Sequence, residues 1–570
     1  MRKRLSLLVI SLLVLSMLAG CGTQQPTTQP STPPAKAPDT QVMNLNLGEE
    51  PPNMDPNKST DQVSFEILNA TQEGLIRMKP GMVIEKGEGL AKDWTISPDG
   101  LTYTFTLKDG LKWSDGKAIT AQDFEYGWKR ALDPNTGSQY AYIMYMIKGA
   151  EALNGVKVKD NPDAAAQIKK AMDELGVKAK DEKTLVVTLE RPTGYFLGLM
   201  GFGTYLPVRK DLVEKYGEKF AAEVANNVYS GPWAMKEWVH ESKIVLEKNP
   251  NYWDAKNVKL EKINFVMIKD ANTQMNMFEK DELDSTGVPG DFLKMYQDKG
   301  TLKRIPEATT WYILFNTKNE IFKNAKIRRA FSLAIDRKGF AEQITQGAHN
   351  AATTYTPPSL LLPDGKTSFA STIDKAYWMP ETAKPDEAKK LLAEGLKELG
   401  LSTTPKFTFL SSDASVAKKY AQAFQAFWKQ NLGVDVEIEL VNFQVRLQKM
   451  DTANYQIAMA GWGGDYNDPQ TFVDLWLSTA TPDSGGNNNA FYNSPTYDKY
   501  VKDGITATET KAKYENYKKA EEEVLKDLPI TPVWWNMRNY VEKTWTKGIA
   551  RFPVGPDIDW KWAYIEGRGK

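Results

Sequence analysis

From about Met43 onward, the chain alternates between two patterns of apolar and polar positions. Tyr103 and Phe105 alternate with threonines, which is the period-two pattern of a strand with one buried face. The turn sequence SPDG at 97–100 separates them from the mostly apolar segment 94–96, so the two segments are predicted to form a hairpin. Because strand and helix signals alternate along the rest of the chain, the sequence predicts an α/β or α+β architecture.

Apolar residues at helical spacing predict several long helices. One begins after Thr120, whose spacing from Asp123 is that of a capping box. A second covers 385–400, with proline at its first position and glycine at its last. Two more are expected over 415–431 and roughly 508–528. We interpret their apolar stripes as core positions.

The first twenty residues have the features of an export signal. Basic residues at 2–4 precede an apolar run over 5–18, which is shorter than the roughly 20 residues needed to span a membrane. The sequence Leu-Ala-Gly-Cys at 18–21 resembles the lipobox of bacterial lipoproteins, in which the cysteine receives a diacylglyceryl group and becomes the first residue after cleavage. Cys21 is the only cysteine of the chain, so lipid attachment is predicted there. An ordinary signal peptide followed by a chance cysteine is the alternative.

The segment after Cys21 predicts a tether. Residues 22–41 are rich in Thr, Gln and Pro and lack apolar periodicity, so they cannot bury enough surface to fold. We expect a signal peptide over 1–20 and a lipidated cysteine with a disordered linker over 21–42. The protein would then be held at the extracytoplasmic face of the cell membrane.

Composition narrows the possible functions. The 570 residues suffice for three or four domains, and 72 basic residues balance 72 acidic ones, so no net positive charge is available to hold nucleic acid. A single cysteine leaves no disulfide framework. The two histidines, His240 and His349, are too far apart for an H-E-x-x-H metal motif. We predict no cofactor and no metal site.

The chain also lacks the sequence motifs of common enzymes. It has no phosphate-binding G-x-x-x-x-G-K-[ST] sequence and no G-x-S-x-G nucleophile elbow. The S-x-x-K pattern at 415–418 lacks its β-lactamase companions and is interpreted as a helix surface. We predict that the protein is not an enzyme. A pair of carboxylates could still assemble in space without a sequence pattern, so a surface hydrolase stays open as an alternative.

Several short segments, in a fixed order over nearly the whole mature chain, resemble the signatures of one family. They are EEP at 49–51 with DP at 55–56, EGL at 73–75, SPDGLTYTF at 97–105, LKWSDG at 111–116, TAQDF at 120–124, GPW at 231–233, KNPNYW at 248–253, FN at 315–316, RRAF at 328–331 with AIDR at 334–337, and AGWGGDYNDP at 460–469. Together they resemble the extracellular solute-binding proteins of peptide-uptake ABC transporters, the oligopeptide-binding type of bacterial solute-binding family 5.

This resemblance implies a two-lobed α/β fold of the periplasmic-binding-protein kind, with an extra subdomain on the first lobe, hinged around a ligand cleft. Hinge crossings map near Tyr312 and Trp534. The implied ranges are 43–74, 193–310 and 535–570 for lobe I, 75–192 for the extra subdomain, and 311–534 for lobe II.

The segment 460–469 carries the main candidate for ligand binding. Gly463 and the neighbouring glycines allow the backbone to come close to a ligand, Trp462 offers a flat apolar wall, and Asp465 offers an anion beside it. In a dry cleft, a carboxylate paired with an ammonium group is strongly favoured over an unpaired one. Family members hold the N-terminal amine of the peptide with the aspartate at this place, so the resemblance implies that role for Asp465. A turn-forming aspartate is the alternative.

Four further residues are placed in the cleft by the resemblance alone. Tyr140 resembles a pocket tyrosine of the family, and Trp534 and Trp535 occupy a segment in which relatives place cleft aromatics. Ser230 begins the Ser-Gly-Pro-Trp segment, where many members read Asn-Gly-Pro-Tyr. Pairing between main chains would supply affinity that does not depend on the peptide's side chains.

Two positions depart from some enteric relatives. Those proteins carry an arginine just before the Ala-Gly-Trp sequence and a histidine before a Lys-Lys pair, and both meet the C-terminal carboxylate of the peptide. Here the same positions are Met459 and Ala417, and neither can hold a carboxylate by charge. A preferred peptide length therefore cannot be carried over from the relatives.

The sequence thus predicts a lipid-anchored and catalytically inert receptor, acting as a monomer. It would bind oligopeptides and hand them to the permease and ATPase subunits of an ABC transporter. The same fold could instead bind an oligosaccharide, a metal complex or one dedicated signalling peptide. The scarcity of histidine argues against nickel, and Asp465 in its amine-binding context argues against a sugar.

Overall fold

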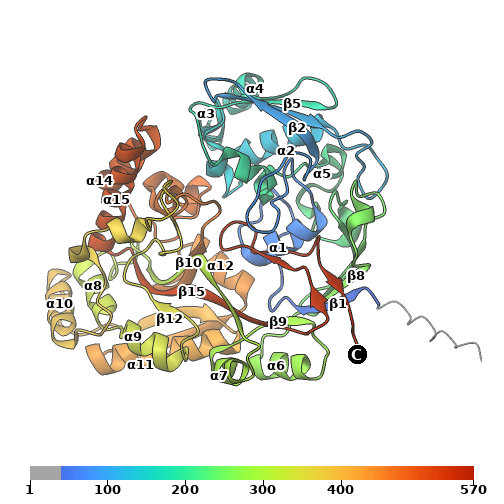
Figure 1. Cartoon of the computed structure of the whole chain (residues 1–570). Helices are drawn as coiled ribbons and strands as arrows, with labels where there is room; N and C mark the ends of the chain where they lie inside the picture. The colour runs from blue at the N-terminus through green and yellow to red at the C-terminus, as the bar shows by residue number, and fades with distance from the viewer. Residues whose placement is uncertain (1–39, 570) are drawn as a thin grey trace, which may run out of the picture. The chain divides into compact units, whose positions relative to one another are not determined.

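The computed structural model describes residues 40–569, and the predicted signal peptide, Cys21 and nearly all of the predicted linker lie outside these residues. An eleven-stranded mixed sheet runs through the described chain (Figure 1). Its strands follow one another in the order β13 (Val436–Val441), β12 (Phe407–Ser412), β14 (Ile457–Gly463), β10 (Lys303–Phe315), β15 (Ile530–Glu542), β9 (Ser285–Gly287), β1 (Val42–Asn46), β8 (Lys262–Val266), β7 (Lys243–Lys248) and β6 (Trp233–Val239), and β11 (Asn350–Ala351) pairs with β15.

Two long antiparallel strands, β10 and β15, connect the two ends of this sheet. Each has 13 residues, and Trp311 of β10 lies opposite Trp534 of β15. Their register shifts between Pro306 and Thr310 and again next to Trp311. Such irregularities bend a strand and increase its twist. Tyr312 and Trp534, the predicted hinge crossings, therefore lie in paired strands near the centre of the sheet.

The fold is two-lobed, with one lobe at each end of the large sheet. The lobe around β12 and β14 has a core that includes Phe331 and Trp428, and the lobe around β1 and β8 has a core that includes Met43 and Trp233. The helices of the first are α8 (Ala325–Leu333), α9 (Arg337–Gly339), α10 (Pro385–Glu398), α11 (Ser415–Leu432), α12 (Phe443–Asp451), α13 (Gln470–Val473), α14 (Pro495–Thr506) and α15 (Thr510–Asp527), and those of the second are α1 (Gln62–Thr71), α5 (Lys210–Tyr216), α6 (Ala271–Glu279) and α7 (Gly290–Asp298).

A four-stranded antiparallel sheet, in the order β2-β3-β5-β4, is separate from the large sheet and belongs to the extra subdomain. The predicted hairpin is confirmed, because Trp94 of β2 pairs with Phe105 of β3. The predicted capping box is confirmed too, since the Asp123 carboxylate accepts a hydrogen bond from the backbone N–H of Thr120. The exact domain boundaries stay a prediction. The elements here are β2 (Ala91–Ile96), β3 (Thr102–Leu107), α2 (Ala121–Leu132), α3 (Ala150–Asn154), α4 (Ala164–Glu174), β4 (Val177–Ala179) and β5 (Thr184–Thr188).

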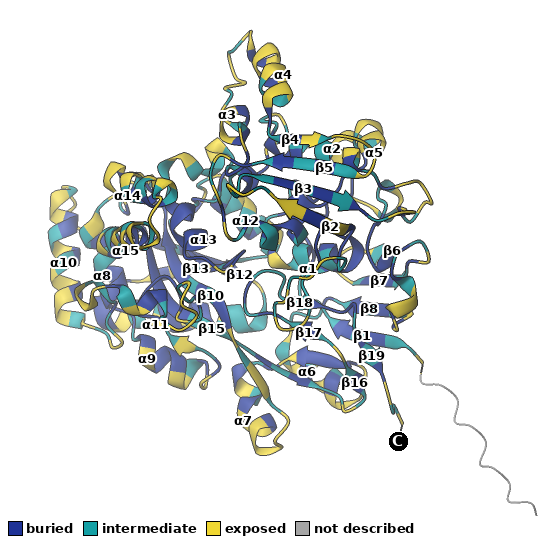
Figure 2. Cartoon of the chain, turned by 45° about the horizontal axis from the view of Figure 1, so that its top comes forward, coloured by how far each residue is buried: buried dark blue, intermediate teal, exposed yellow. Residues whose placement is uncertain are grey.

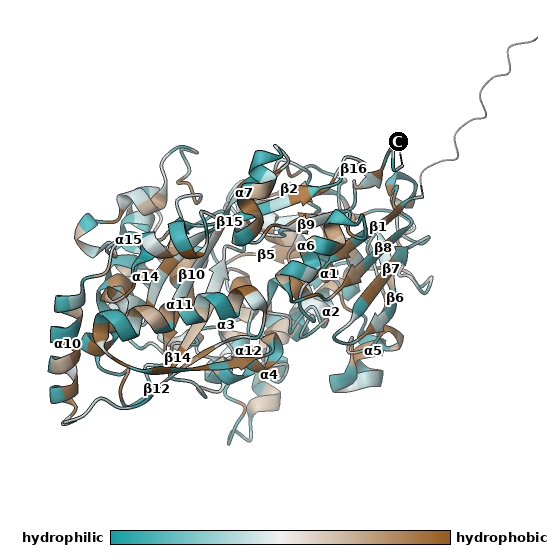
Figure 3. Cartoon of the chain, turned by 90° about the horizontal axis from the view of Figure 1, so that it is seen from below, coloured by the Kyte–Doolittle hydropathy of each residue, from teal (hydrophilic) through white to brown (hydrophobic). Residues whose placement is uncertain are grey.

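The remaining four strands are short and lie near the C-terminus. They pair as β16 (Thr546–Lys547) with β19 (Tyr564–Ile565) and β17 (Ala550–Arg551) with β18 (Ile558–Asp559). The predicted helices are confirmed as α2, α10, α11 and α15, with differences of at most two residues at their ends. The outer faces of α10 and α15 are exposed, whereas strand β10 turns buried towards its end (Figure 2). Hydrophilic and hydrophobic residues alternate along helix α10 (Figure 3). Its Ala388 and Leu392 are buried. Between residues 40 and 569, none of the helices has the length and hydrophobicity to span a bilayer.

Candidate ligand-binding cleft

A cavity of about 560 Å³ lies against the centre of the large sheet. Residues of β10, β14 and β15 form part of its lining, together with residues of α1, α11 and α12 and the segment around Tyr140. The volume is within the range of about 300–1,000 Å³ that is typical of ligand pockets. Because the lining comes from both lobes, a ligand in this cavity would contact both.

Asp465 borders this cavity two residues beyond the end of β14. The hydroxyl of Tyr140 donates a hydrogen bond to its Oδ1 at 3.2 Å, and the hydroxyl of Thr471 donates to its Oδ2 at 3.4 Å. Burial raises the pKa of the Asp465 carboxyl to about 8, although both hydrogen bonds act to lower it. No cation of the described chain contributes to this shift. The cleft therefore contains a buried carboxyl group without a positive partner.

An aromatic wall lies beside this carboxyl. The rings of Trp462 and Tyr140 are stacked with centroids 6.1 Å apart and an interplanar angle of 13°. The indole of Trp462 is fixed by its Nε1, which donates to the backbone carbonyl of Thr471 at 2.7 Å. A buried aromatic wall lowers the local dielectric constant and strengthens the attraction of Asp465 for a cation.

One edge of β14 is open where it borders the cavity. The strand pairs with β10 along its whole length, but it pairs with β12 only at Ile457 and Ala458. From Met459 to Gly463 the second edge has no strand partner among the described residues, and all of these residues line the cavity. An open strand edge presents N–H and C=O groups to which an extended peptide can pair.

Close packing leaves little room for a side chain at two glycines of β14. A Cβ atom at Gly461 would lie 2.8 Å from the indole of Trp311, and one at Gly463 would lie 3.1 Å from the hydroxyl of Thr309. The sequence suggested that these glycines make room for a ligand. In the structure they also allow β14 to pack against its neighbour β10.

A second group of aromatic residues surrounds Trp534. Its ring stacks on Trp311 with centroids 5.3 Å apart and on His349 with centroids 5.8 Å apart. Burial lowers the pKa of His349 to about 4, so this imidazole is neutral at pH 7. A second cavity of about 410 Å³ shares His349 and Tyr420 with the first, so the cleft continues beyond these rings.

Arg446 also lines the main cavity, and the sequence analysis did not single it out. It lies on α12, is 5% exposed, and donates a hydrogen bond from Nη1 to the backbone carbonyl of Met459. Burial lowers its pKa to about 10, so it keeps its positive charge at neutral pH. Nothing in the sequence of a short polar helix distinguishes an arginine in a cavity from one in solvent.

Most of the predicted binding residues border the cavity, but Trp535 does not. Successive side chains of a strand point to opposite faces, so Trp534 and Trp535 cannot both face the cleft. The indole Nε1 of Trp535 donates to the backbone carbonyl of Thr354 at 3.2 Å. Ligand binding by the lining residues stays a prediction. Those that line the cavity are Tyr140, Trp462, Gly463, Asp465 and Trp534.

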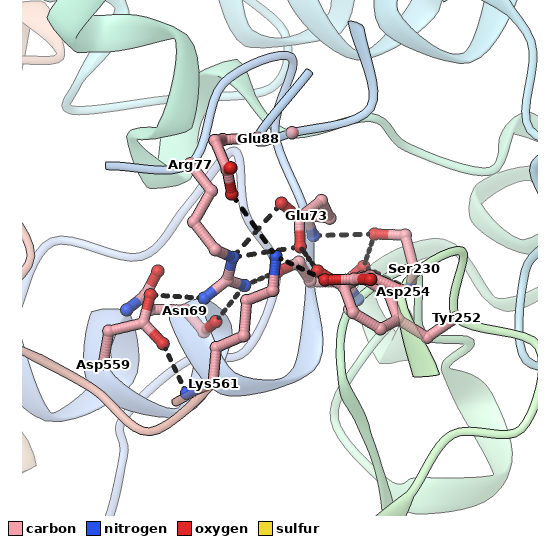
Figure 4. A network of polar contacts seen from close by, with 12 residues as sticks. Asn69, Glu73, Arg77, Glu88, Ser230, Tyr252, Asp254, Asp559 and Lys561 are labelled. Atoms are coloured by element: carbon pink, nitrogen blue, oxygen red, sulfur yellow. Dashed lines mark hydrogen bonds and ion pairs between the residues drawn. The ribbon is translucent and has the colours of Figure 1, made fainter. Parts of the chain in front are cut away.

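Ser230 lies in a buried polar network outside the lining of the cavity (Figure 4). Its hydroxyl donates to Oε1 of Gln72 at 2.8 Å and accepts from the backbone N–H of Glu73 at 2.9 Å. Glu73 in turn pairs with Arg77 at 3.0 Å. Ser230 therefore holds the chain after α1 against the start of β6, which accounts for its place away from the cleft.

The comparisons with known proteins agree with this fold and cleft. The family model described as bacterial extracellular solute-binding proteins, family 5 Middle, matches residues 87–484. The oligopeptide-binding protein OppA of Bacillus subtilis (strain 168) is 36% identical over 576 residues, which cover 99% of this chain and 100% of the relative. The chain therefore belongs to family 5 of the bacterial extracellular solute-binding proteins. More particularly, it is a solute-binding protein of the peptide ABC-transporter type and not an enzyme.

Two solved structures of relatives differ in how well they superpose on this chain. Listeria monocytogenes OppA bound to peptide is 32% identical and superposes with a TM-score of 0.84, covering 93% of this chain and 100% of its own. The unliganded open form of the periplasmic murein tripeptide-binding protein MppA is 28% identical and covers 93% and 98%, but its TM-score is only 0.56. The described chain is thus more similar in structure to the peptide-bound protein than to the open form.

Proposed function

We propose that this protein is a lipid-anchored extracellular receptor that binds oligopeptides between its lobes and delivers them to the permease of an ABC transporter. The observation that supports peptide binding most directly is the buried, unpaired carboxyl of Asp465 beside the open edge of β14. A peptide complements both features, because it has one α-ammonium group and a backbone that can pair with a strand.

The α-ammonium group would ionise Asp465 and pair with it. An unpaired carboxylate is disfavoured in this buried site, which is why its pKa is raised. A cation within hydrogen-bond distance reverses that penalty, and the hydroxyls of Tyr140 and Thr471 already point donors at the anion. The N-terminus of the peptide would therefore be held by charge at this end of the cavity.

The rest of the peptide would add as a strand along residues 459–463 of β14. Backbone hydrogen bonds supply affinity that is the same for every sequence, and ordered water can fill the space around side chains of different size. This arrangement favours a receptor with a broad peptide range over one that recognises a single sequence.

Mass spectrometry of material released by denaturing the purified protein tests this proposal. We expect a mixture of short peptides. Peptides of that kind, added at a hundredfold excess over Kd, should stabilise the protein against unfolding by about 2.7 kcal/mol. A single recovered sequence would instead indicate a dedicated signalling peptide. If only a sugar or metal complex is recovered and no peptide raises the Tm, peptide binding is refuted.

Lipid anchoring rests on Cys21 in its lipobox-like sequence, which lies outside the described residues. One acyl chain gives only marginal membrane binding, whereas two give stable anchoring. We expect Cys21→Ser to abolish incorporation of labelled fatty acid and to release the protein from the membrane fraction or leave it as a precursor. Membrane association as firm as that of the parent would contradict the anchor.

Delivery to the transporter can be measured separately from binding. The receptor is proposed to act as a monomer and to need both the permease and the ATPase subunits. Uptake of a labelled peptide by cells should therefore be lost when the permease is absent, while the purified receptor still binds the same peptide. Unchanged uptake without the permease would contradict this part of the proposal.

A further inference from the structure

Arg446 is a buried cation in the cleft without a charged partner. The residue is 5% exposed and lines the 560 Å³ cavity, and α12 packs against β12, the strand that pairs with β14 (Figure 3). Its Nη1 donates to the carbonyl oxygen of Met459, whereas its Nε has no hydrogen-bond partner among the described residues. The guanidinium also lies 5.2 Å from the ring centroid of Phe443, which fixes its position.

Other buried arginines of the described chain are satisfied. Arg328 and Arg337 donate to several backbone carbonyls each, Arg77 pairs with Glu73, and Arg538 pairs with carboxylates as well. An arginine has five N–H groups in a fixed fork, and leaving one of them unpaired in a buried site is costly. Arg446 therefore differs from the arginines that serve only the fold.

No carboxylate of the described residues forms an ion pair with Arg446. Among the described residues, the only carboxylate whose charge acts on it is Glu49, and Glu49 already pairs with Lys269 at 3.3 Å. A buried charge is stable when it is paired and hydrogen-bonded, and the planar guanidinium matches the two oxygens of a carboxylate. The missing partner in this site is thus an anion supplied from the cavity.

Arg446 and Asp465 lie at the two ends of the open strand edge. Arg446 is bonded to Met459, the first open residue, and Asp465 follows two residues after Gly463, the last one. Four residue steps of a strand span about 13 Å, and six span about 20 Å. An extended peptide of roughly four to six residues would therefore place its ammonium group at Asp465 and a carboxylate at Arg446.

We propose that Arg446 binds a carboxylate of the peptide ligand, supplied either by its C-terminus or by an acidic side chain at that position. This inference rests on the proposed function and adds to it the carboxylate end of the ligand. It also explains how the cleft can hold a carboxylate although Met459 and Ala417 are uncharged, since the backbone of Met459 positions the cation.

Calorimetry with the full-length protein and two variants tests the inference. Arg446→Met removes the charge and keeps most of the volume. Lys449→Met is the matched control, because it removes one positive charge from the same helix, where Lys449 pairs with Glu439 at 2.7 Å outside the cavity lining. Arg446→Lys changes the same side chain but keeps the charge. If it retains the parent's preference, the effect of Arg446→Met is due to loss of the charge and not to misfolding. The probes are peptides of three to eight residues, each as free acid and as C-terminal amide, and a second series with glutamate or glutamine at each inner position.

If the C-terminus is the partner, the parent and Lys449→Met should bind acids of about four to six residues at least tenfold more tightly than the amides. Arg446→Met should bind acid and amide equally. If an acidic side chain is the partner, amidation should not change the affinity. The parent should then bind a peptide with glutamate at one inner position more tightly than the same peptide with glutamine there. Either result supports a carboxylate at Arg446. The inference is overturned if peptides bind but Arg446→Met shows the parent's preferences in both series. If the parent binds no peptide, the proposed function itself has failed.

Discussion

The hydroxyl of Tyr140 donates a hydrogen bond to the carboxyl of Asp465 across 325 positions of the sequence, with 3.2 Å between Oη and Oδ1. Tyr140 comes from the segment before α3 and Asp465 from the loop after β14, so the contact joins the extra subdomain to the opposite lobe. The same tyrosine stacks on Trp462. Opening of the lobes should therefore remove a donor from the carboxylate, so we expect cleft closure to complete the Asp465 site.

Replacing Asp465 with asparagine should remove the ion pair that holds the positively charged N-terminus of the peptide. Truncating one member of a buried charge pair costs roughly 2–5 kcal/mol, or about 30- to several-thousand-fold in Kd. N-acetylation of the peptide removes the other member and should weaken binding by the parent similarly. Calorimetry of parent and variant, each with free and acetylated peptide, gives a double-mutant cycle.

The losses of binding free energy caused by Asp465→Asn and by N-acetylation should not add, since both changes break the same interaction. Strictly additive losses would return Asp465 to the role of a turn residue. Asp435→Asn is a suitable control, because that carboxylate is exposed and pairs only with Lys429 on the surface. It should leave the affinity for both peptides unchanged.

Peptide binding should release a proton below pH 8. The pKa of Asp465 is raised by burial from 3.8 to about 8, so the unliganded carboxyl carries a proton at pH 7 and loses it when an ammonium group pairs with it. Affinity should rise between pH 5 and 8 and fall above pH 8 as the peptide amine, with a pKa of about 8, loses its own proton. Calorimetry in buffers of different ionisation enthalpy measures the released proton. Asp465→Asn should release none from this site, and equal release by both proteins would contradict the assignment.

The titration of Asp465 should also affect the stability of the unliganded protein. Its contribution to stability should fall as the pH rises, whereas the affinity for peptide rises. The folded state binds the extra proton between pH 4 and 8, because the pKa of Asp465 is higher in the folded than in the unfolded chain. Its contribution to stability is present below pH 4 and is lost as the pH rises towards 8. Asp474 lies nearby and its pKa is raised too, so the quantity to compare is the difference between parent and Asp465→Asn in urea unfolding. This difference should change with pH in that window and level off above it.

A tyrosine pair outside the main cavity should set the balance between open and closed forms. Tyr195 and Tyr466 stack with centroids 4.2 Å apart, and the Tyr195 hydroxyl donates to Gln470 at 3.0 Å. An aromatic pair contributes about 0.5–1.5 kcal/mol beyond its area. Tyr195→Ala should therefore weaken peptide binding by about two- to tenfold without touching the ligand, and it should enlarge the radius of gyration in X-ray scattering. Tyr195→Phe keeps the stack and should lie between parent and alanine variant. A full loss with phenylalanine would show that the hydrogen bond, not the stack, maintains closure.

The sequence predicted the structure best where the interactions are local. The hairpin at 94–105, the capping box at Thr120 and the helix that begins at Pro385 depend on residues close in the chain, and all three are present. The resemblance to a family placed Asp465 in a segment that does line the cavity. Its raised pKa and the hydroxyl of Tyr140 come from tertiary packing, which has no pattern in sequence.

The missed and misplaced residues have physical reasons of the same kind. Arg446 is a cleft residue only because α12 packs on β12 and brings the guanidinium to the carbonyl of Met459 in β14, and the helix has no local feature that marks it. Ser230 resembles a family position by its neighbours, but its hydroxyl is used by Gln72 and Glu73. Trp535 is the one case that the pattern could have resolved, since strand alternation excludes it once Trp534 faces the cleft.

The network in Figure 4 should govern stability and leave peptide binding almost unchanged. Arg77 is buried between Glu73 and Asp559, which ties the chain after α1 to the C-terminal strand β18. Removing one partner from a buried ion pair costs about 3–5 kcal/mol, because the remaining charge is left unpaired. Arg77→Met should lower the unfolding free energy by that amount in urea titration. Lys169→Met breaks the exposed pair with Asp173 and should leave the unfolding free energy almost unchanged, because solvent screens that pair.

The two variants together separate folding from recognition. Neither Arg77 nor its partners Glu73 and Asp559 line the 560 Å³ cavity, so folded Arg77→Met should bind peptide within about twofold of the parent. Measurements at a temperature well below its Tm keep the variant folded. Equal stability of Arg77→Met and Lys169→Met would mean that water reaches Glu73 and Asp559 and that the network is not a buried one. If Arg77→Met has a normal unfolding free energy but binds peptide much more weakly, the network takes part in ligand binding. That result would contradict the position of Ser230, which lies in the same network outside the lining of the cavity.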